Sequence, residues 1–511
     1  MRSINYALLF LGCLLFHLVG TWSVPLIDRD EPRFAEASRE MMESGDYIVP
    51  HFNNQLRLDK PPLAYWAQVA SYRIFGENDF AARFPSAIAA ALIALSILAW
   101  GRRIGGDGVG WWAAIIFTLS LQTFIHAKAA VADMWLVLFV TIAHWAGYEL
   151  IQRPTPNVQR PTRNSEGIHQ TSNIKHQTFG FWLMFYLALA FGFLAKGPIA
   201  WTPLLTLVTV KLFARDVELG KRFKFMRGVI LMLALVAMWG IPALIRTRGQ
   251  FLIVGIGRHV VGRSFGAMEG HGANSLGLYL LLLPFYFVTI FVSFLPWSIK
   301  LPWLMRKLWP RPGAGIADPG YSRDRIDNYL LAGVGIIFVI FTLSKTKLPH
   351  YTLPAFPLLS LLLARHWSWP VQAGRAHRSL LKAIVIVTVC LWLAIALVVP
   401  PLIAPSFPAY ALFQKSRDYL RPEMEFGSVD YQEPSLIWYF RSRLTGWMTP
   451  LGAANASQFM ERNGPRFVIL PTGLVPQIFP NLSSGWKMFS TRGFNIAKGK
   501  RVDLTLILKP E

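Results

Sequence analysis

The sequence predicts a polytopic α-helical membrane protein that ends in a small α/β domain. Of its 511 residues, 53% are hydrophobic, and they include 19 Trp and 36 Phe. Such a chain carries more apolar surface than a soluble core buries, so part of it must face lipid. Long apolar runs and a change of composition near residue 404 are the other two observations that predict this fold class.

About eleven apolar runs approach the ~20 residues that cross a bilayer. They lie at residues 4–24, 83–100, 111–126, 130–150, 180–195, 197–213, 228–246, 276–298, 329–344, 351–366 and 382–403. Only one basic residue precedes the first run, and no clear small-x-small cleavage site follows it. We therefore expect a retained first helix rather than a signal peptide.

The net charge of +23 is distributed over short loops between the apolar runs. This placement argues against nucleic acid as a partner and is typical of the positive-inside rule. With the N-terminus inside, the cytoplasmic loops are all basic: 101–110, 151–179, 214–227, 299–328 and 367–381. The opposite face then receives loop 25–82, the turns near 127–130 and 197–198, loops 247–275 and 345–350, and everything after residue 403. Nearly all the unusual polar motifs lie on this face.

After residue 403 short β-type runs such as FVIL and LTLIL alternate with helix-like segments. We therefore predict two domains, a transmembrane domain at 1–403 and an α/β domain at 404–511. The two cysteines, Cys13 and Cys390, lie inside apolar runs, which excludes a disulfide framework or a zinc cluster built on cysteine.

The most unusual segment is DEPRFAEASREMMESGDYIVPHFNNQLRLDKPPLAYW at residues 30–66. Acidic residues followed by Pro32 predict a helix from 32 to about 43. Its apolar face predicts an amphipathic helix that lies on the bilayer surface. Asp30, held there and partly desolvated, could act as a general base; a helix-capping role is the alternative.

The second half of this loop places Lys60 before a pair of prolines and the start of another helix. A lysine beside a helix N-terminus is suited to bind an anion, most naturally a phosphate. The alternative is an interfacial lysine whose charged end reaches water from an aromatic belt.

Asp133 lies at the outer end of the fourth apolar run, in HAKAAVADMWLVLF. A carboxylate inside the membrane is costly and is by default a functional candidate. Lys128 could instead be its structural partner. Lys196, in FLAKGP, lies in an outward turn between two runs.

Two further outward segments carry polar side chains. The loop RHVVGRSFGAMEGHG contains His259 and Arg263, and a metal site from His259, Glu269 and His271 is one alternative, although their spacing matches no strong ligand signature. The segment LSKTKLPHYTLPAFP contains candidate site residues beside prolines that can keep backbone groups open to a cavity. These candidates are Lys347, His350 and Tyr351.

Taken together, these segments resemble the polytopic GT-C glycosyltransferases. Within them the chain is most similar to the group of lipid A aminoarabinose transferases and dolichyl-phosphate-mannose protein mannosyltransferases. The resemblance covers most of 20–360 in the same order, and SVDYQEPSLIWYF extends it into the outer domain. It implies about 11–13 transmembrane helices and a site that faces the periplasm from a bacterial inner membrane.

The resemblance also implies roles for individual residues. Asp30 matches the catalytic aspartate of the first loop, Asp133 a second acidic position, and Lys60 the lysine that holds the donor phosphate. The helpers of Lys60 would be Arg33, Arg263 and Tyr351. Further site residues would be Glu31, Asp59, Lys196, His259, Lys347 and His350. Asp59 stands where aminoarabinose transferases often have glutamate, which leaves the substrate and any divalent cation open.

The function implied is inverting transfer of a sugar from a polyprenyl-phosphate donor to lipid A. We expect a monomer, and a divalent cation is the one cofactor left open. Protein or another envelope glycan is the alternative acceptor. A lipid-linked-sugar transporter is the alternative class. A transporter should place its ionisable residues near the bilayer midplane on broken helices, whereas here they gather at one surface.

Overall fold

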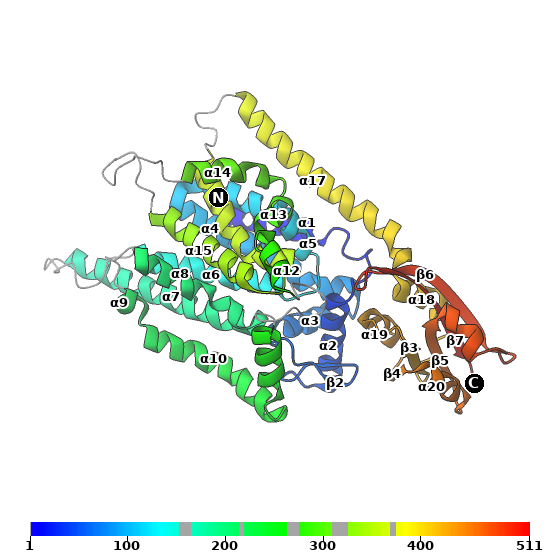
Figure 1. Cartoon of the computed structure of the whole chain (residues 1–511). Helices are drawn as coiled ribbons and strands as arrows, with labels where there is room; N and C mark the ends of the chain where they lie inside the picture. Colours follow the sequence, from blue (N-terminus) through cyan, green and yellow to red (C-terminus); the bar gives the residue numbers. More distant parts are fainter. Residues whose placement is uncertain (1, 153–164, 214–218, 263–274, 309–324, 368–374) are drawn as a thin grey trace.

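The computed structural model describes residues 2–152, 165–213, 219–262, 275–308, 325–367 and 375–511 (Figure 1). Among these residues, six helices are long and apolar enough to cross a membrane. They are α4 (Asp79–Leu119), α6 (Asp133–Gln152), α7 (Ser165–Lys196), α10 (Phe225–Arg246), α15 (Arg325–Leu343) and α17 (Arg375–Ile403). The prediction of a polytopic helical membrane protein is confirmed.

Two of the predicted apolar runs, 83–100 and 111–126, meet in the single element α4. Gly106 interrupts this element with a φ of 83° that favours glycine. A Cβ added to Gly101 would lie 2.6 Å from the Cα of Gly110, although nine residues of a straight helix span about 14 Å. The chain therefore folds back at Gly106, and α4 consists of two helical segments.

Other predicted runs are divided into shorter pieces. The run 276–298 forms α12 (Leu276–Leu281) and α13 (Phe285–Ser293), followed by a 3-10 turn at Trp297–Lys300. Proline lacks the backbone N–H that continues a helix, and Pro284 and Pro296 lie at these two breaks. Outside the first loop, the other α-helices described before the C-terminal sheet region are α1 (Arg2–Leu18), α5 (Leu121–His126), α8 (Thr202–Phe213), α9 (Leu219–Phe223), α14 (Leu301–Leu308) and α16 (Phe356–His366).

A five-stranded sheet with the order β4-β3-β5-β7-β6 follows the last long helix. Strands β3, β4 and β5 are mutually parallel, and β7 pairs antiparallel with both β5 and β6. The strands are β3 (Glu425–Val429), β4 (Met448–Leu451), β5 (Arg466–Pro471), β6 (Lys487–Asn495) and β7 (Lys500–Lys509). The helices of this region are α18 (Pro408–Ser416), α19 (Pro434–Arg441), α20 (Ala453–Glu461) and α21 (Val475–Ile478). The predicted C-terminal α/β region is thus present.

The first loop contains α2 (Asp30–Ser44), a two-stranded hairpin and α3 (Leu63–Phe75). The helix α2 ends at Gly45, whose φ of 69° terminates it in the left-handed conformation. Both helices are therefore where the sequence predicts them. The prediction that α2 lies on the bilayer surface was wrong, because α2 is buried along most of its length between α3 and α19 (Figure 1).

Buried ion pairs explain why a helix with so many charges lies inside the protein. Arg39 pairs with Glu36 at 2.7 Å and lies over the Trp438 ring at 3.9 Å. Arg441 of α19 pairs with the same Glu36. These paired charges join the first loop to the C-terminal region.

Glu31 joins three more segments. Its carboxylate accepts two hydrogen bonds from Arg83 of α4, at 2.9 and 2.7 Å. It also accepts the N–H groups of Ile27 at 2.8 Å and Ala130 at 2.7 Å. Arg83 donates its other N–H groups to carbonyls of residues 21, 24 and 25. The pair therefore holds the segment before α2, α4 and the turn before α6 together.

We predict that Glu31→Gln destabilises the protein strongly, because Arg83, 1% exposed, would keep a buried charge without its anion. Breaking a buried pair on one side costs about 3–5 kcal/mol. The melting temperature of the purified protein in detergent measures the effect, with the exposed Glu423→Gln as the matched control. Equal melting temperatures for both variants would contradict the assigned role of Glu31.

Candidate active site

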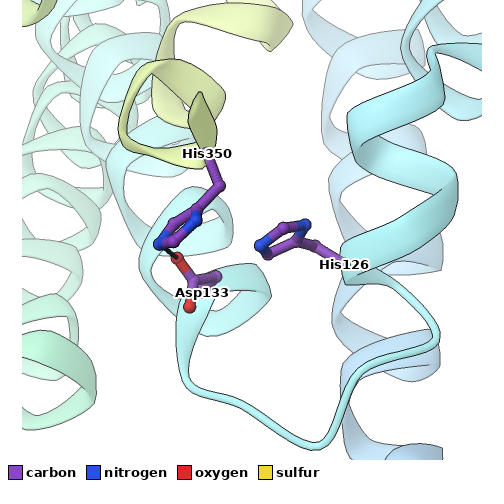
Figure 2. A group of neighbouring side chains, drawn as sticks. All are labelled: His126, Asp133 and His350. Atoms are coloured by element: carbon purple, nitrogen blue, oxygen red, sulfur yellow. Dashed lines mark ion pairs between the residues drawn. The ribbon is translucent and has the colours of Figure 1, made fainter. Parts of the chain in front are cut away.

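Asp133 is the centre of a cluster built from four segments of the chain. It is the first residue of α6 and is 8% exposed. Lys196, the last residue of α7, contacts its carboxylate at 2.5 Å. The Nε2 atom of His350 lies 3.9 Å from the same carboxylate, and the His126 ring is centred 4.9 Å from the His350 ring (Figure 2). Three predicted site residues thus lie together, with His126 as an addition.

Lys128 is not the partner of Asp133, so that alternative was wrong. Its ammonium donates to the carbonyls of Phe16, His17 and Val19 at 3.1, 2.9 and 2.6 Å. These carbonyls lie at or just beyond the C-terminal end of α1, where a cation stabilises a helix. Burial and the nearby charge of Arg83 together lower the pKa of Lys128 to about 7. Lys128 therefore secures the first helix, and Asp133 remains paired with Lys196.

The side chains of His126, Asp133 and His350 point toward one shared space (Figure 2). Their ligand atoms lie within 4.8 Å of one another, and two imidazoles with a carboxylate form a donor set that zinc accepts. Lys196 already neutralises the carboxylate, so a metal ion would have to displace this ammonium. The other metal site considered from the sequence combines His259, Glu269 and His271. Glu269 and His271 lie outside the described residues, and His259 is described only by its backbone, in the π-helix Leu252–Gly262.

A second cluster lies in the first loop. Arg57 donates to the Tyr65 hydroxyl at 2.8 Å and to the Asp59 carboxylate at 3.2 Å. Burial lowers the pKa of the Arg57 guanidinium, but the charges of Asp59 and Asp30 more than offset this and hold the pKa above its usual value. Asp30 is itself exposed. Sequence reasoning missed Arg57, although its place two residues before Asp59 in RLDKPP was a usable signal.

A cavity of about 350 Å³ joins the two clusters. Asp59 contributes to its wall from the first loop, and Lys196 contributes from the Asp133 cluster. Most other lining side chains are apolar, and they come largely from α10 and the segment after it. Examples are Phe193, Leu233, Trp239, Leu244 and Phe251. The arrangement suits a ligand with a long apolar part and one anionic group.

The other predicted site residues lie at differing places. Tyr351 is close to the Asp133 cluster, because its ring centre is 5.9 Å from the Lys196 ammonium. Lys60 is half-buried beside Asp59, and its ammonium donates to the Asp59 carbonyl at 3.4 Å. Arg33 is close enough to Asp28 for its charge to lower the pKa of that half-buried carboxyl. Partial burial still raises this pKa to about 7, against the hydrogen bonds from Ser435 and the charge of Arg33.

Two predicted residues have structural contacts instead. Lys347 is 5% exposed and donates to the carbonyls of Phe341 and Thr342 at 3.0 and 2.5 Å, where α15 ends. Both carboxylate oxygens of Glu31 accept hydrogen bonds from Arg83 and from backbone N–H groups. Arg263 lies outside the described residues.

Comparison with known proteins gives three consistent matches. The family model described as dolichyl-phosphate-mannose-protein mannosyltransferase matches residues 59–158. The undecaprenyl phosphate-alpha-4-amino-4-deoxy-L-arabinose arabinosyl transferase of Aeromonas salmonicida is 30% identical over 69% of this chain, which spans only 58% of that relative. The transferase of the same name from Enterobacter sp. is 27% identical over the whole chain and 87% of its own length.

Among solved structures, ArnT from Cupriavidus metallidurans bound to undecaprenyl phosphate superposes with a TM-score of 0.71. The two chains are 19% identical, and 98% of each is covered. The fold is that of the polytopic GT-C glycosyltransferases. Within that class the chain resembles the aminoarabinose transferases, as the sequence predicts.

We predict strong coupling between Asp133 and Lys196. Lys196→Met leaves the buried carboxylate unpaired and should cost about 3–5 kcal/mol, whereas the double variant Asp133→Asn, Lys196→Met removes both charges and should recover much of this loss. Melting temperatures in detergent measure both effects, and the exposed Lys382→Met is the control. The single variant Asp133→Asn is measured as well. If the loss of stability of the double variant equals the sum of the losses of the two single variants, the pairing is refuted.

Proposed function

We propose that the chain is an inverting glycosyltransferase that moves a sugar from a polyprenyl-phosphate donor to lipid A, in an aminoarabinose-type transfer. It would act as a monomer in a bacterial inner membrane with its site toward the periplasm. The proposed division places the transmembrane enzyme at 1–403 and the periplasmic α/β domain at 404–511.

The cavity between the two clusters is the observation that carries this proposal. Its apolar wall suits a prenyl chain, since burying each CH₂ group of a chain is favourable by about 0.8 kcal/mol. Lys196 in the same wall, with Lys60 next to Asp59, suits the phosphate at the end of that chain. A transporter would need its charged residues near the bilayer midplane, on broken helices. Here Asp59 of the first loop and Lys196 at the end of α7 line the cavity instead.

The reaction follows from the chemistry of a lipid-phosphate leaving group. The bond between the anomeric carbon and the phosphate oxygen breaks, and Lys60 and Lys196 stabilise the negative charge that develops on the phosphate. An acceptor oxygen attacks the opposite face of the anomeric carbon, which inverts its configuration. Asp30, an exposed carboxylate at the start of α2, would take the proton when the acceptor is a hydroxyl.

A phosphate acceptor needs no strong base. In that case Asp30 would orient the acceptor or stabilise positive charge that develops on the sugar. In both cases Asp133 stays paired with Lys196 and holds this ammonium toward the donor. The names of the relatives from Aeromonas and Enterobacter support undecaprenyl phosphate as the donor lipid and aminoarabinose as the sugar.

Asp30→Asn should lower transfer about 10²–10⁴-fold, the usual range for loss of a general base. Binding of undecaprenyl phosphate should survive, because the cavity wall is unchanged. Product formation from a purified lipid-linked sugar measures the first effect, and equilibrium binding of radiolabelled undecaprenyl phosphate measures the second. Asp418→Asn, whose side chain is 83% exposed, is the control. Unchanged product formation by Asp30→Asn would rule out its catalytic role.

Mass spectrometry of lipid A and of the polyprenyl-phosphate pool, with and without the protein, tests the substrates. Loss of the protein should leave lipid A unmodified and accumulate the lipid-linked sugar. An unchanged lipid A together with a changed protein or glycan would favour the alternative acceptor.

A further inference from the structure

The C-terminal sheet has a crevice at the carboxyl ends of its parallel strands. The strand β3 lies between β4 and β5, so the chain runs first to one side of β3 and then to the other. Such a reversal separates the loops that follow the strands, and open α/β sheets bind ligands in the crevice so formed. Here the residues after β3 and β5 line a cavity of about 990 Å³, which includes Asp430, Tyr431 and Gly473.

The charged side chains in the wall of this crevice are mainly basic. Four cationic side chains from β6, β7 and their connection line it, namely Arg492, Lys498, Lys500 and Arg501. Only two carboxylates, Asp430 and Asp503, lie among the lining residues. Arg492 contacts Asp503 at 3.4 Å, and both side chains are at least half exposed, so water screens this pair. The excess of positive charge suits an anionic ligand.

The crevice opens where the last long apolar helix ends. Ser406, three residues beyond α17, is part of its wall. Strand β6 packs directly on this turn, because a Cβ on Gly493 would lie 2.6 Å from the Ser406 carbonyl oxygen and 2.8 Å from Pro408 Cγ. Only glycine allows this approach. The cationic side chains are thereby held next to the end of a membrane helix, where the headgroup of a lipid would lie.

One carboxylate connects the crevice to the first loop. Glu433 is 3% exposed and accepts from Asn495 at 2.9 Å, and Lys498 approaches it at 3.8 Å. Its other oxygen accepts from Arg29 at 3.2 Å. Arg29 immediately precedes Asp30, so a ligand in the crevice would lie beside the segment that presents this carboxylate.

We infer that this crevice binds the phosphate-bearing headgroup of the anionic acceptor lipid and delivers it to Asp30. The inference rests on the proposed function and adds to it the site that selects the acceptor. Inorganic phosphate shares the same chemistry, but the position of the crevice at the end of α17 favours a lipid headgroup. The exposed cations would contribute mainly through electrostatic attraction, which salt screens.

The test compares the full-length protein in detergent with the double variant Lys500→Glu, Arg501→Glu. Reversing both exposed charges should raise the KM and the Kd for bis-phosphorylated lipid A about tenfold. The KM for the donor and the melting temperature should stay the same. The matched control is Arg421→Glu, Arg443→Glu, which reverses two exposed charges outside the crevice.

Direct binding of lipid A separates this inference from the proposed function. If no variant or wild-type protein transfers sugar, the proposed function fails, yet the difference in Kd still decides whether the crevice binds lipid A. An unchanged Kd in the crevice variant, or an equal loss in the control variant, would overturn the inference. Inorganic phosphate that displaces lipid A at equal concentration would also overturn it, because the site would then recognise free phosphate.

Discussion

The arrangement of this protein depends on one buried ion pair, between Glu31 and Arg83. A carboxylate removed from water must be paired and fully hydrogen-bonded, and Glu31 meets this demand with partners from three segments. It directly follows Asp30, and its partner Ala130 lies three residues before Asp133. The two predicted catalytic carboxylates are therefore placed relative to each other by a third carboxylate, Glu31, through its hydrogen bonds to Arg83 and Ala130.

The requirement that buried charges be paired also fixes the position of the C-terminal region. Charges of the first loop are buried against α19, where Glu36 pairs with both Arg39 and Arg441. Asp28 accepts two hydrogen bonds from Ser435 in the same interface, at 2.9 and 2.5 Å. These contacts hold the sheet beside the loop that carries Asp30. Segments about 400 residues apart thus form one polar layer.

Much of the fold and part of the site could be predicted because their signals are local. Apolar runs, the helix that ends at Gly45 and the start of α6 at Asp133 depend on neighbouring residues alone. The surface position of α2 was wrong, because its apolar periodicity does not show that its charged face is paired inside the protein. The partner of Asp133 was missed for the same reason: Lys128 is near in sequence, whereas Lys196 is near in space.

The sequence by itself determined the class of protein and its membrane-spanning character. Hydrophobicity, loop charge and glycine or proline positions are properties of short stretches, and lipid imposes them directly. Only the tertiary structure decided that Arg57 and His126 lie beside the predicted residues Asp59 and Asp133, and that Lys347 donates to carbonyls at the end of α15. Burial and pairing depend on residues distant in the chain, so the cavity between the two clusters exists only once the segments are packed together.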